Sequence, residues 1–299
     1  MNFKEILVAK TEYAEKVLAS YLPKEEGYQK IVLESMNYSA MVGGKRLRPI
    51  LMKECYELFG GEDNRIEPFM AALEMIHNYS LVHDDLPAMD NDEYRRGKKT
   101  TWTVYGEGMA VLAGDGLLNL AFEVAASAFD QAVTEKQLRS TAKAIQVLGQ
   151  KAGIYGMIGG QAADIEAESG KEVTEELLLF IHENKTAALI QAAMMIGAIL
   201  AEAGEEAVSA MEKAAYNIGI AFQIQDDILD VTSTTEVLGK PVGSDEKNNK
   251  LTYVTLHGLE ESKEEVEKLS TEALSILKSF DKRNVFLEEL VESLITREK

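Results

Sequence analysis

The sequence predicts an all-α protein. Apolar residues recur at the three- to four-residue spacing of amphipathic helices along most of the 299 residues. Alternation of apolar and polar residues, the sign of a half-buried strand, never extends beyond about five positions. With 22 glycines and 5 prolines the chain is also poor in the residues that build turns, which disfavours an all-β fold. The expected architecture is a helical bundle.

The first helix is predicted over 3–22, where an apolar stripe that includes Leu7, Val17 and Leu18 is ended by Pro23. Each later helix is a run with the same periodicity between breaks that are mostly rich in glycine. These runs are 28–42, 47–59, 66–86, 107–130, 134–149, 154–168, 174–183, 185–203, 205–232, 260–279 and 284–297. The breaks fall at Gly43-Gly44, Gly60-Gly61, 91–106, Gly170, Gly204 and 239–249.

The segments 66–130 and 185–232 are expected to form the middle of the bundle, because their helices are apolar on more than one face. Residues 187–201 are the most apolar stretch, but about 15 residues are too few to span a bilayer. We therefore expect a core helix that packs through small residues, and no membrane span. No linker or repeat divides the chain, so one domain over 1–299 is expected.

Charge and cysteine content narrow the possible functions. The net charge of −19 argues against nucleic-acid binding, which needs a basic surface. The single cysteine, Cys55, excludes a disulfide framework and a cysteine-based zinc site, and it fits a reducing cytosol. Charges at Lys4, Glu5 and Lys10 interrupt the N-terminal residues before any apolar run, unlike a signal peptide. A cytoplasmic location is predicted.

An acidic cluster ends the apolar helix predicted over 66–86. Five acidic residues lie between Asp84 and Glu93, and Arg95 and Arg96 follow. Carboxylates at a helix C-terminus oppose the helix dipole, so a bound cation would stabilise them. Carboxylates without histidine or thiolate partners suit Mg²⁺. The cluster taken alone also fits a solvated helix end that pairs with the two arginines.

A second acidic cluster on another central helix favours the metal interpretation. Gln223, Asp226, Asp227 and Asp230 follow helical spacing and form one polar stripe between apolar residues. Carboxylates in such surroundings are costly to bury unless they are paired or bind a metal. Two such stripes on neighbouring helices can face each other and hold metal ions between them.

Basic residues form a third cluster, GGKRLRP at 43–49. A glycine pair followed by Lys45, Arg46 and Arg48 at a helix start supplies N–H groups and guanidinium donors for an anion. Lys240 lies in a second loop, after the second acidic helix. Metal ions would chelate one diphosphate and these cations would bind a second anion, which makes the negative net charge no obstacle.

Five motifs, in this order, resemble the trans-isoprenyl diphosphate synthase family. They are GGKRLRP at 43–49, the DDxxxxD pattern at 84–90 with Arg95-Arg96, Gly159-Gly160-Gln161 to Asp164, Lys185-Thr186, and Asp226 to Asp230. The resemblance covers residues from about 40 to 256 and implies the isoprenoid-synthase helical bundle, with a central cavity flanked by two Asp-rich motifs. It also implies a homodimer.

The resemblance implies that isopentenyl diphosphate attacks an allylic diphosphate ionised by Mg²⁺, with about three ions per active site and Mn²⁺ as a possible substitute. The implied metal ligands are Asp84, Asp90 and Asp226, with Asp85 and Asp230 in support. The residues implied for the allylic diphosphate are Arg95, Lys185 and Lys240. Those implied for isopentenyl diphosphate are Lys45, Arg48, His77 and Arg96. Thr186 and Gln223 would place oxygen atoms near the carbocation, and with Lys185 they form the implied catalytic set.

Product length is expected to depend on Tyr79, five residues before Asp84 and about 7.5 Å along the helix at 1.5 Å per residue. An aromatic ring there would close a cavity that extends from the metal site. Tyr79, with Ser80 beside it and the four-residue spacer of the first motif, is similar to bacterial farnesyl diphosphate synthases. The other interpretation is that Tyr79 only packs between helices.

The loop after Arg96 departs from the family pattern. The family commonly has Pro and His where this sequence has Lys99 and Trp102, which puts the conformation of that loop in question. His83, His182 and His257 are interpreted as structural histidines. His77 is expected to face the cavity, because it lies two helical turns before Asp84.

Four other functions share some of these features with a farnesyl diphosphate synthase. A geranylgeranyl diphosphate synthase differs only in product length. A non-catalytic subunit of a heteromeric synthase is expected to have degraded Asp motifs, and both are intact here. A metal phosphohydrolase would need more histidine ligands than the four histidines offer. A terpene cyclase takes no second diphosphate and has no use for the basic motif.

Overall fold

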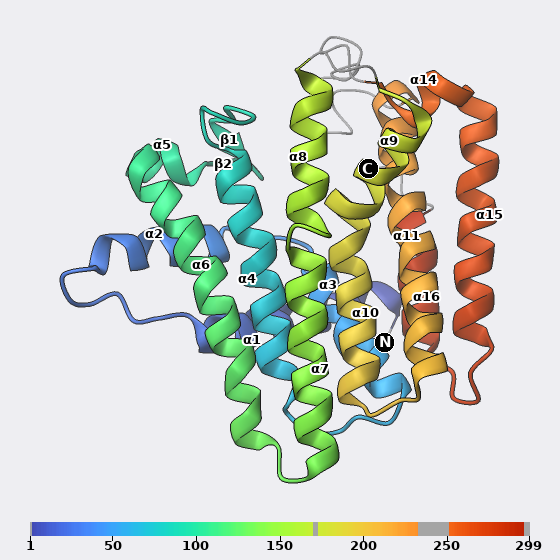
Figure 1. The fold of residues 1–299 in the computed structure, drawn as a ribbon, viewed down its shortest axis with the longest axis horizontal. Coiled ribbons are helices and arrows are strands. Elements are labelled where there is room, and N and C mark those ends of the chain that lie inside the picture. The colour runs from blue at the N-terminus through green and yellow to red at the C-terminus, as the bar shows by residue number, and fades with distance from the viewer. Residues whose placement is uncertain (1, 170–172, 233–250, 296–299) are drawn as a thin grey trace.

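A computed structural model describes residues 2–169, 173–232 and 251–295, and it is a helical bundle as predicted (Figure 1). Its longer helices are α1 (Phe3–Tyr21), α2 (Lys30–Met41), α3 (Leu47–Leu58), α4 (Ile66–Asp84), α6 (Glu107–Ser127), α7 (Glu135–Ala152), α8 (Met157–Glu168), α10 (Ala188–Leu200), α11 (Glu205–Thr232), α15 (Leu259–Lys278) and α16 (Val285–Ile295). The shorter ones are α5 (Thr101–Tyr105), η1 (Ala128–Gln131), α9 (Glu175–Ile181), η2 (His182–Ala187) and α14 (Tyr253–His257).

The helices that the sequence predicted are all present, with ends that differ by a few residues. The breaks at Gly170 and 239–249 lie outside the described residues. The predicted break over 91–106 contains a small antiparallel hairpin of β1 (Tyr94–Arg95) and β2 (Lys98–Lys99), followed by α5. These are the only strands among the described residues. Helix α14 and the π-helical turn η2 were also not predicted.

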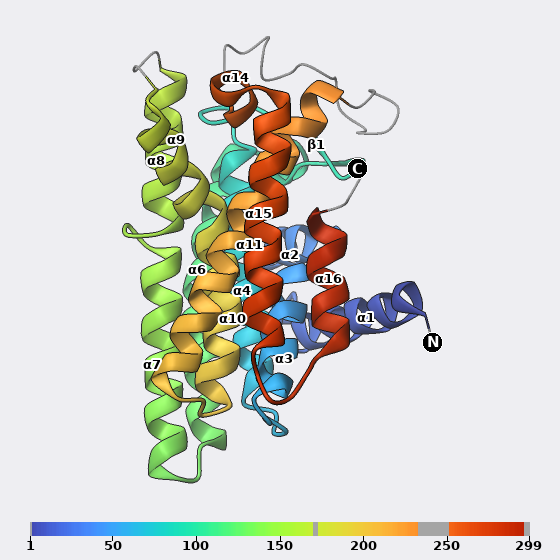
Figure 2. The ribbon, with the colours of Figure 1, turned by 90° about the vertical axis from the view of Figure 1, so that its right-hand side faces the viewer.

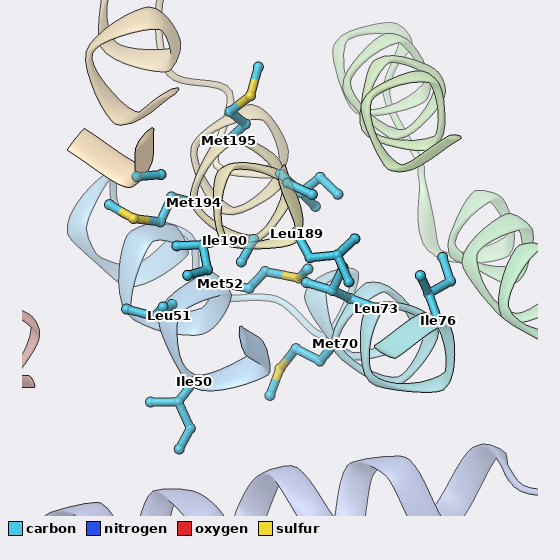
Figure 3. Packing of buried hydrophobic residues seen from close by; sticks show 14 of the residues in the cluster. Ile50, Leu51, Met52, Met70, Leu73, Ile76, Leu189, Ile190, Met194 and Met195 are labelled. Atoms are coloured by element: carbon cyan, nitrogen blue, oxygen red, sulfur yellow. The ribbon is translucent and has the colours of Figure 1, made fainter. Parts of the chain in front are cut away.

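Helix α10 forms the centre of the bundle. Every one of its 13 residues is buried, and it packs against α3, α4, α7 and α11. Figure 3 shows its side chains Leu189, Ile190 and Met194 against residues of α3 and α4. The expectation that 187–201 is a core helix is therefore confirmed. The alanines and the glycine of α10 let four neighbouring helices approach it at once.

The helices around α10 carry the Asp-rich motifs to one end of the bundle. Helix α4 packs on α6, and α11 packs on α15. Figure 1 places the C-terminal ends of α4 and α11 at its upper end, with α8 and α9 nearby. Figure 2 shows α15 and α16 side by side on one side of the molecule. Both Asp-rich motifs lie at these C-terminal ends, so the fold brings them to the same end, as the sequence analysis expected.

One described segment, Glu107–Gln131, is long and apolar enough to cross a membrane by length and composition alone. It comprises α6 and η1, and 39% of its most apolar window is buried in the bundle. A core helix of a globular bundle passes the same test. This segment differs from 187–201, the stretch that the sequence indicated as the most apolar.

Candidate active site

A cavity of about 380 Å³ opens between α4, α8, η2 and the start of α10. Seven of the residues that the sequence analysis selected line it: Arg48, His77, Tyr79, Ser80, Asp84, Lys185 and Thr186. Its other lining residues are largely apolar and include Met89, Met157, Ile158, Ile165 and Leu189. The cavity thus joins the charged side chains of Arg48, Asp84 and Lys185 to an apolar space, which suits a ligand with a charged head and a hydrocarbon tail.

A second cavity, of about 520 Å³, has four lysine and arginine side chains in its wall and is called the basic cavity below. Its lining comprises Val42, Gly43, Gly44, Lys45, Arg46, Leu47, Arg48, Glu74, His77 and Arg96. Arg48 and His77 line both cavities, so the two cavities adjoin. The four residues implied for isopentenyl diphosphate, Lys45, Arg48, His77 and Arg96, all line this second cavity.

The first motif ends α4 and presents Asp84 to the cavity. Gln161 Nε2 on α8 donates a hydrogen bond of 3.0 Å to Asp84 Oδ1. Burial raises the pKa of Asp84 to about 6, and the neighbouring Asp90 adds to the rise while Lys185 opposes it. The pKa of Asp90 is also raised, chiefly by burial. Burial and like charges therefore make the ionised carboxylates unfavourable, a state that a bound cation would relieve.

Asp85 and Arg95 bind each other instead of lining this cavity. Arg95 Nε donates a hydrogen bond of 2.7 Å to Asp85 Oδ1, and Arg95 also lies 3.7 Å from Asp92. Asp85 is buried, and both residues line a separate small cavity beside α2. This ion pair joins the β1–β2 hairpin to the end of α4. Pairing of the acidic cluster with the two arginines was the alternative that the sequence left open beside a metal site.

The second motif lies on α11. Gln223 Oε1 accepts a hydrogen bond of 3.0 Å from the Thr186 hydroxyl, which brings these two predicted residues together across η2 and α11. Asp226 is half-buried and Asp230 is buried, one turn apart on α11. The linings of the two cavities, within the described residues, do not include either aspartate.

Between these two aspartates, Asp227 serves a different purpose. Its Oδ2 atom accepts a hydrogen bond of 2.9 Å from the backbone N–H of Tyr253. This contact attaches α14 to α11, so the chain that returns after 233–250 is tied to the second motif. The sequence analysis did not include Asp227 among the ligands.

Lys185 and Thr186 lie in η2, a π-helical turn inserted between α9 and α10. Such widened turns are rare in proteins, and those that occur often lie at functional sites. Gly160 of α8 permits the close approach of η2, because a Cβ at Gly160 would lie 2.2 Å from the Lys185 backbone nitrogen. Lys185 Nζ forms an ion pair with Asp164, one turn further along α8. The family-like segment from Gly159 to Asp164 therefore positions the predicted lysine.

The basic cavity is organised by a buried ion pair. Arg46 has a left-handed backbone (φ 49°) and a buried side chain. Its guanidinium donates to Glu74 Oε1 at 2.8 Å and to the Ala40 carbonyl oxygen at 2.8 Å. These contacts join α2, α3 and α4 and fix the backbone between Lys45 and Arg48. Arg46, which the sequence suggested as an anion-binding cation, is therefore bound to Glu74, a residue that no motif indicated.

His77 lies at the boundary of the two cavities, as its spacing from Asp84 predicted. Its pKa is lowered well below the usual value, first by burial and then by the nearby charges of Arg48, Arg96 and Arg46. The imidazole is therefore neutral at pH 7 and offers one donor and one acceptor. Arg96 donates a hydrogen bond to the Gly43 carbonyl oxygen, which places the glycine pair beside it.

The loop after Arg96 is held by several hydrogen bonds, although Lys99 and Trp102 replace the proline and histidine of the family pattern. Trp102 Nε1 and Thr100 Oγ1 both donate to the Asp92 carbonyl oxygen, at 2.9 and 2.8 Å. The Tyr38 hydroxyl on α2 donates to the Lys99 carbonyl oxygen at 2.7 Å. Backbone and indole groups thus close the hairpin without the proline and histidine of the family pattern. Lys240 lies outside the described residues.

The residues present fit Mg²⁺. The described residues contain no group of three His, Cys, Asp or Glu side chains arranged to hold a metal alone. Mg²⁺ commonly takes one or two protein carboxylates and completes its shell with water and substrate phosphates. Asp84 offers such a carboxylate at the cavity, with a raised pKa that a divalent cation would offset. The oxygen-only donors of both motifs favour a hard cation over zinc.

Comparison with known proteins identifies the family. The family model described as polyprenyl synthetase matches residues 29–293 of this chain. The chain is 41% identical to the farnesyl diphosphate synthase of Escherichia coli, with all of both chains covered. It is 42% identical to a geranylgeranyl diphosphate synthase of Cyanophora paradoxa, over 99% of this chain and 97% of that protein. The structure is similar to that of geranylgeranyl pyrophosphate synthetase from Pyrococcus horikoshii, with a TM-score of 0.89, 29% identity and full coverage of both chains.

Both the sequence and the fold therefore agree with the resemblance seen in the motifs, and Mg²⁺ binding is typical of this family. The chain belongs to the polyprenyl synthetase family and is a prenyltransferase that elongates prenyl chains.

Proposed function

We propose that this protein is a farnesyl diphosphate synthase. It condenses isopentenyl diphosphate head to tail with dimethylallyl diphosphate and then with geranyl diphosphate, and the C15 product is released. The observation that carries the proposal is Tyr79, which lines the cavity, is 6% exposed and lies five residues before Asp84 on the same helix. An aromatic ring at this depth limits the hydrocarbon length that fits beyond the aspartates. The similar protein from Cyanophora paradoxa makes geranylgeranyl diphosphate synthesis the second candidate.

The allylic diphosphate is proposed to bind at the Asp-rich end of the cavity. Asp84, Asp90 and Asp226 would hold Mg²⁺, with Asp85 and Asp230 in support. When bound, Mg²⁺ supplies positive charge that neutralises the departing diphosphate. Lys185, Arg95 and Lys240 are proposed to bind the diphosphate oxygens directly. The ion pair of Lys185 with Asp164 supports this role, because it holds the ammonium at the cavity wall.

The side-chain oxygen atoms of Thr186 and Gln223 are proposed to stabilise the allylic carbocation. The Thr186 hydroxyl donates its hydrogen to Gln223 Oε1, so its lone pairs remain available on the threonine oxygen. Fixed dipoles of this kind act most strongly where water is excluded. The apolar lining by Met157, Ile158 and Leu189 supports such exclusion.

Isopentenyl diphosphate is proposed to bind in the adjoining basic cavity through Lys45, Arg48, His77 and Arg96. Because Arg48 and His77 line both cavities, a diphosphate held there would direct its hydrocarbon toward the allylic carbon. The neutral His77 can donate one hydrogen bond without adding charge. The double bond of isopentenyl diphosphate then attacks the carbocation, and the proton that is lost passes to the released pyrophosphate.

We also propose that the protein acts as a single domain over 1–299 and as a homodimer. Helix α6 supports the homodimer, because it is strongly apolar and its Val111 and Leu112 side chains are 40% and 49% exposed. A second copy would cover such a surface.

The choice of allylic substrate tests the proposed product length. Purified protein with Mg²⁺ and isopentenyl diphosphate is given dimethylallyl, geranyl or farnesyl diphosphate in parallel reactions. We expect efficient elongation of the first two and a kcat/KM for farnesyl diphosphate lower by about 10²-fold or more, because Tyr79 leaves no space for a C15 chain. A kcat/KM for farnesyl diphosphate equal to that for geranyl diphosphate would favour the geranylgeranyl alternative.

A further inference from the structure

His83 forms part of the cavity wall next to Tyr79. It lies one helical turn after Tyr79 on α4, so both rings are on the same face. The ring centroids are 5.8 Å apart in an edge-to-face arrangement, and both side chains line the cavity. His83, which the sequence suggested as a structural histidine, is therefore one of the side chains that bound the space open to a growing chain.

Helix α6 holds His83 from the other side. His83 Nε2 lies 3.1 Å from the Val111 carbonyl oxygen, which can only accept, so Nε2 is the protonated nitrogen of this contact. The ring fits against α6 because residue 114 is glycine. A Cβ on Gly114 would lie 2.1 Å from His83 Nε2 and 2.4 Å from its Cδ2 atom. The imidazole therefore occupies the space that any larger residue at 114 would need.

The other glycines of α6 have different surroundings. A Cβ on Gly108 would meet no atom within 4 Å. A Cβ on Gly116 would meet the sulfur of Met36 at 2.7 Å, but that atom belongs to a flexible side chain. Gly114 alone among these three faces an aromatic ring of the cavity wall. This difference supplies matched controls on a single helix.

We propose that Gly114 of α6, acting through the imidazole of His83 on α4, is a second determinant of product length beside Tyr79. The inference rests on the prenyl-elongating activity and deepens it, and it holds for either product length. Ordinary contacts begin at 3.4 Å, so a methyl group at position 114 would displace the imidazole by about 1 Å or more. The α6 backbone blocks one direction, and the ring moves toward Tyr79 and into the cavity. The space for the growing chain becomes shorter.

The test compares the products of Gly114→Ala with those of wild type, using isopentenyl and dimethylallyl diphosphates with Mg²⁺. We expect the ratio of the product one isoprene unit shorter to the main wild-type product to rise about tenfold, which is within the range for one overpacked methyl group. Gly108→Ala and Gly116→Ala should retain the wild-type ratio. An unchanged or longer product from Gly114→Ala, or the same shortening in Gly108→Ala, would overturn the proposal.

A double-mutant cycle identifies the ring as the cause. His83→Ala should lengthen the product, and adding Gly114→Ala to it should produce no further shortening, because the methyl group then has no ring to displace. Equal shortening in both backgrounds would refute the proposal. If Gly114→Ala does not fold, His83→Ala decides alone, and a product no longer than that of wild type would refute it. A wild-type C20 product would contradict the farnesyl assignment and leave these comparisons valid.

Discussion

Replacing Asp84 with alanine is expected to lower kcat by at least about 10³-fold, because the variant loses a carboxylate that we propose holds Mg²⁺ at the departing diphosphate. The same loss is expected for Asp226→Ala on the other motif. The measurement is turnover at saturating Mg²⁺ and substrates. Near-normal turnover in either variant would contradict the assignment of the metal ligands.

The fold of Asp84→Ala should remain intact. Burial raises the pKa of Asp84 to about 6, above the usual value for an aspartate, so the ionised form at pH 7 destabilises the folded state. Removing this carboxylate should leave the melting temperature unchanged or raise it, as is common when a catalytic group is removed. Asp92→Ala is the matched control, because Asp92 is an exposed carboxylate two residues beyond Asp90. It should retain most of the activity.

Replacing Tyr79 with alanine is expected to lengthen the main product from C15 to C20 or longer. The ring is buried in the cavity wall, and its removal opens space in which a C15 allylic chain can bind and be extended. The measurement is chromatographic sizing of the dephosphorylated products. A C15 product from Tyr79→Ala would mean that another residue ends the cavity.

Tyr79→Phe is the matched control for that substitution. The Tyr79 hydroxyl is buried without a hydrogen-bond partner, so its removal should not lower stability, since burying an unpaired hydroxyl is unfavourable. The phenylalanine ring retains almost the same volume. The product should therefore stay at C15, which separates the effect of ring size from that of the hydroxyl.

Sequence periodicity predicted the helices well because most of them bury one continuous apolar face. Helix α10 is the clearest case, since an unbroken apolar run of small and branched residues requires burial on all sides. The hairpin Tyr94–Lys99 was not predicted because two-residue strands are too short to show alternation. The π-helical turn that carries Lys185 was also missed, because its sequence continues the periodicity of the adjoining helices.

Positions in the candidate site were predictable for residues that share one helix, because their spacing along the helix fixes where they lie. His77, Tyr79 and Asp84 share α4 and line the cavity. The seven-residue spacing placed His77 on the face of Asp84, and the five-residue spacing gave the depth of Tyr79 along the helix. Contacts between distant segments were not predictable from spacing. Examples are Gln161 with Asp84, Asp164 with Lys185, and the imidazole of His83 against Gly114. Each depends on how α8, η2 or α6 packs against its neighbours.

Product analysis of the wild-type protein tests the account most directly. Purified protein is incubated with labelled isopentenyl diphosphate, dimethylallyl diphosphate and Mg²⁺, and the dephosphorylated products are sized by chromatography. We predict a dominant C15 alcohol, with Tyr79 ending the cavity. A dominant C20 alcohol would contradict the farnesyl assignment, and a folded protein that forms no condensation product with Mg²⁺ would contradict the proposed active site.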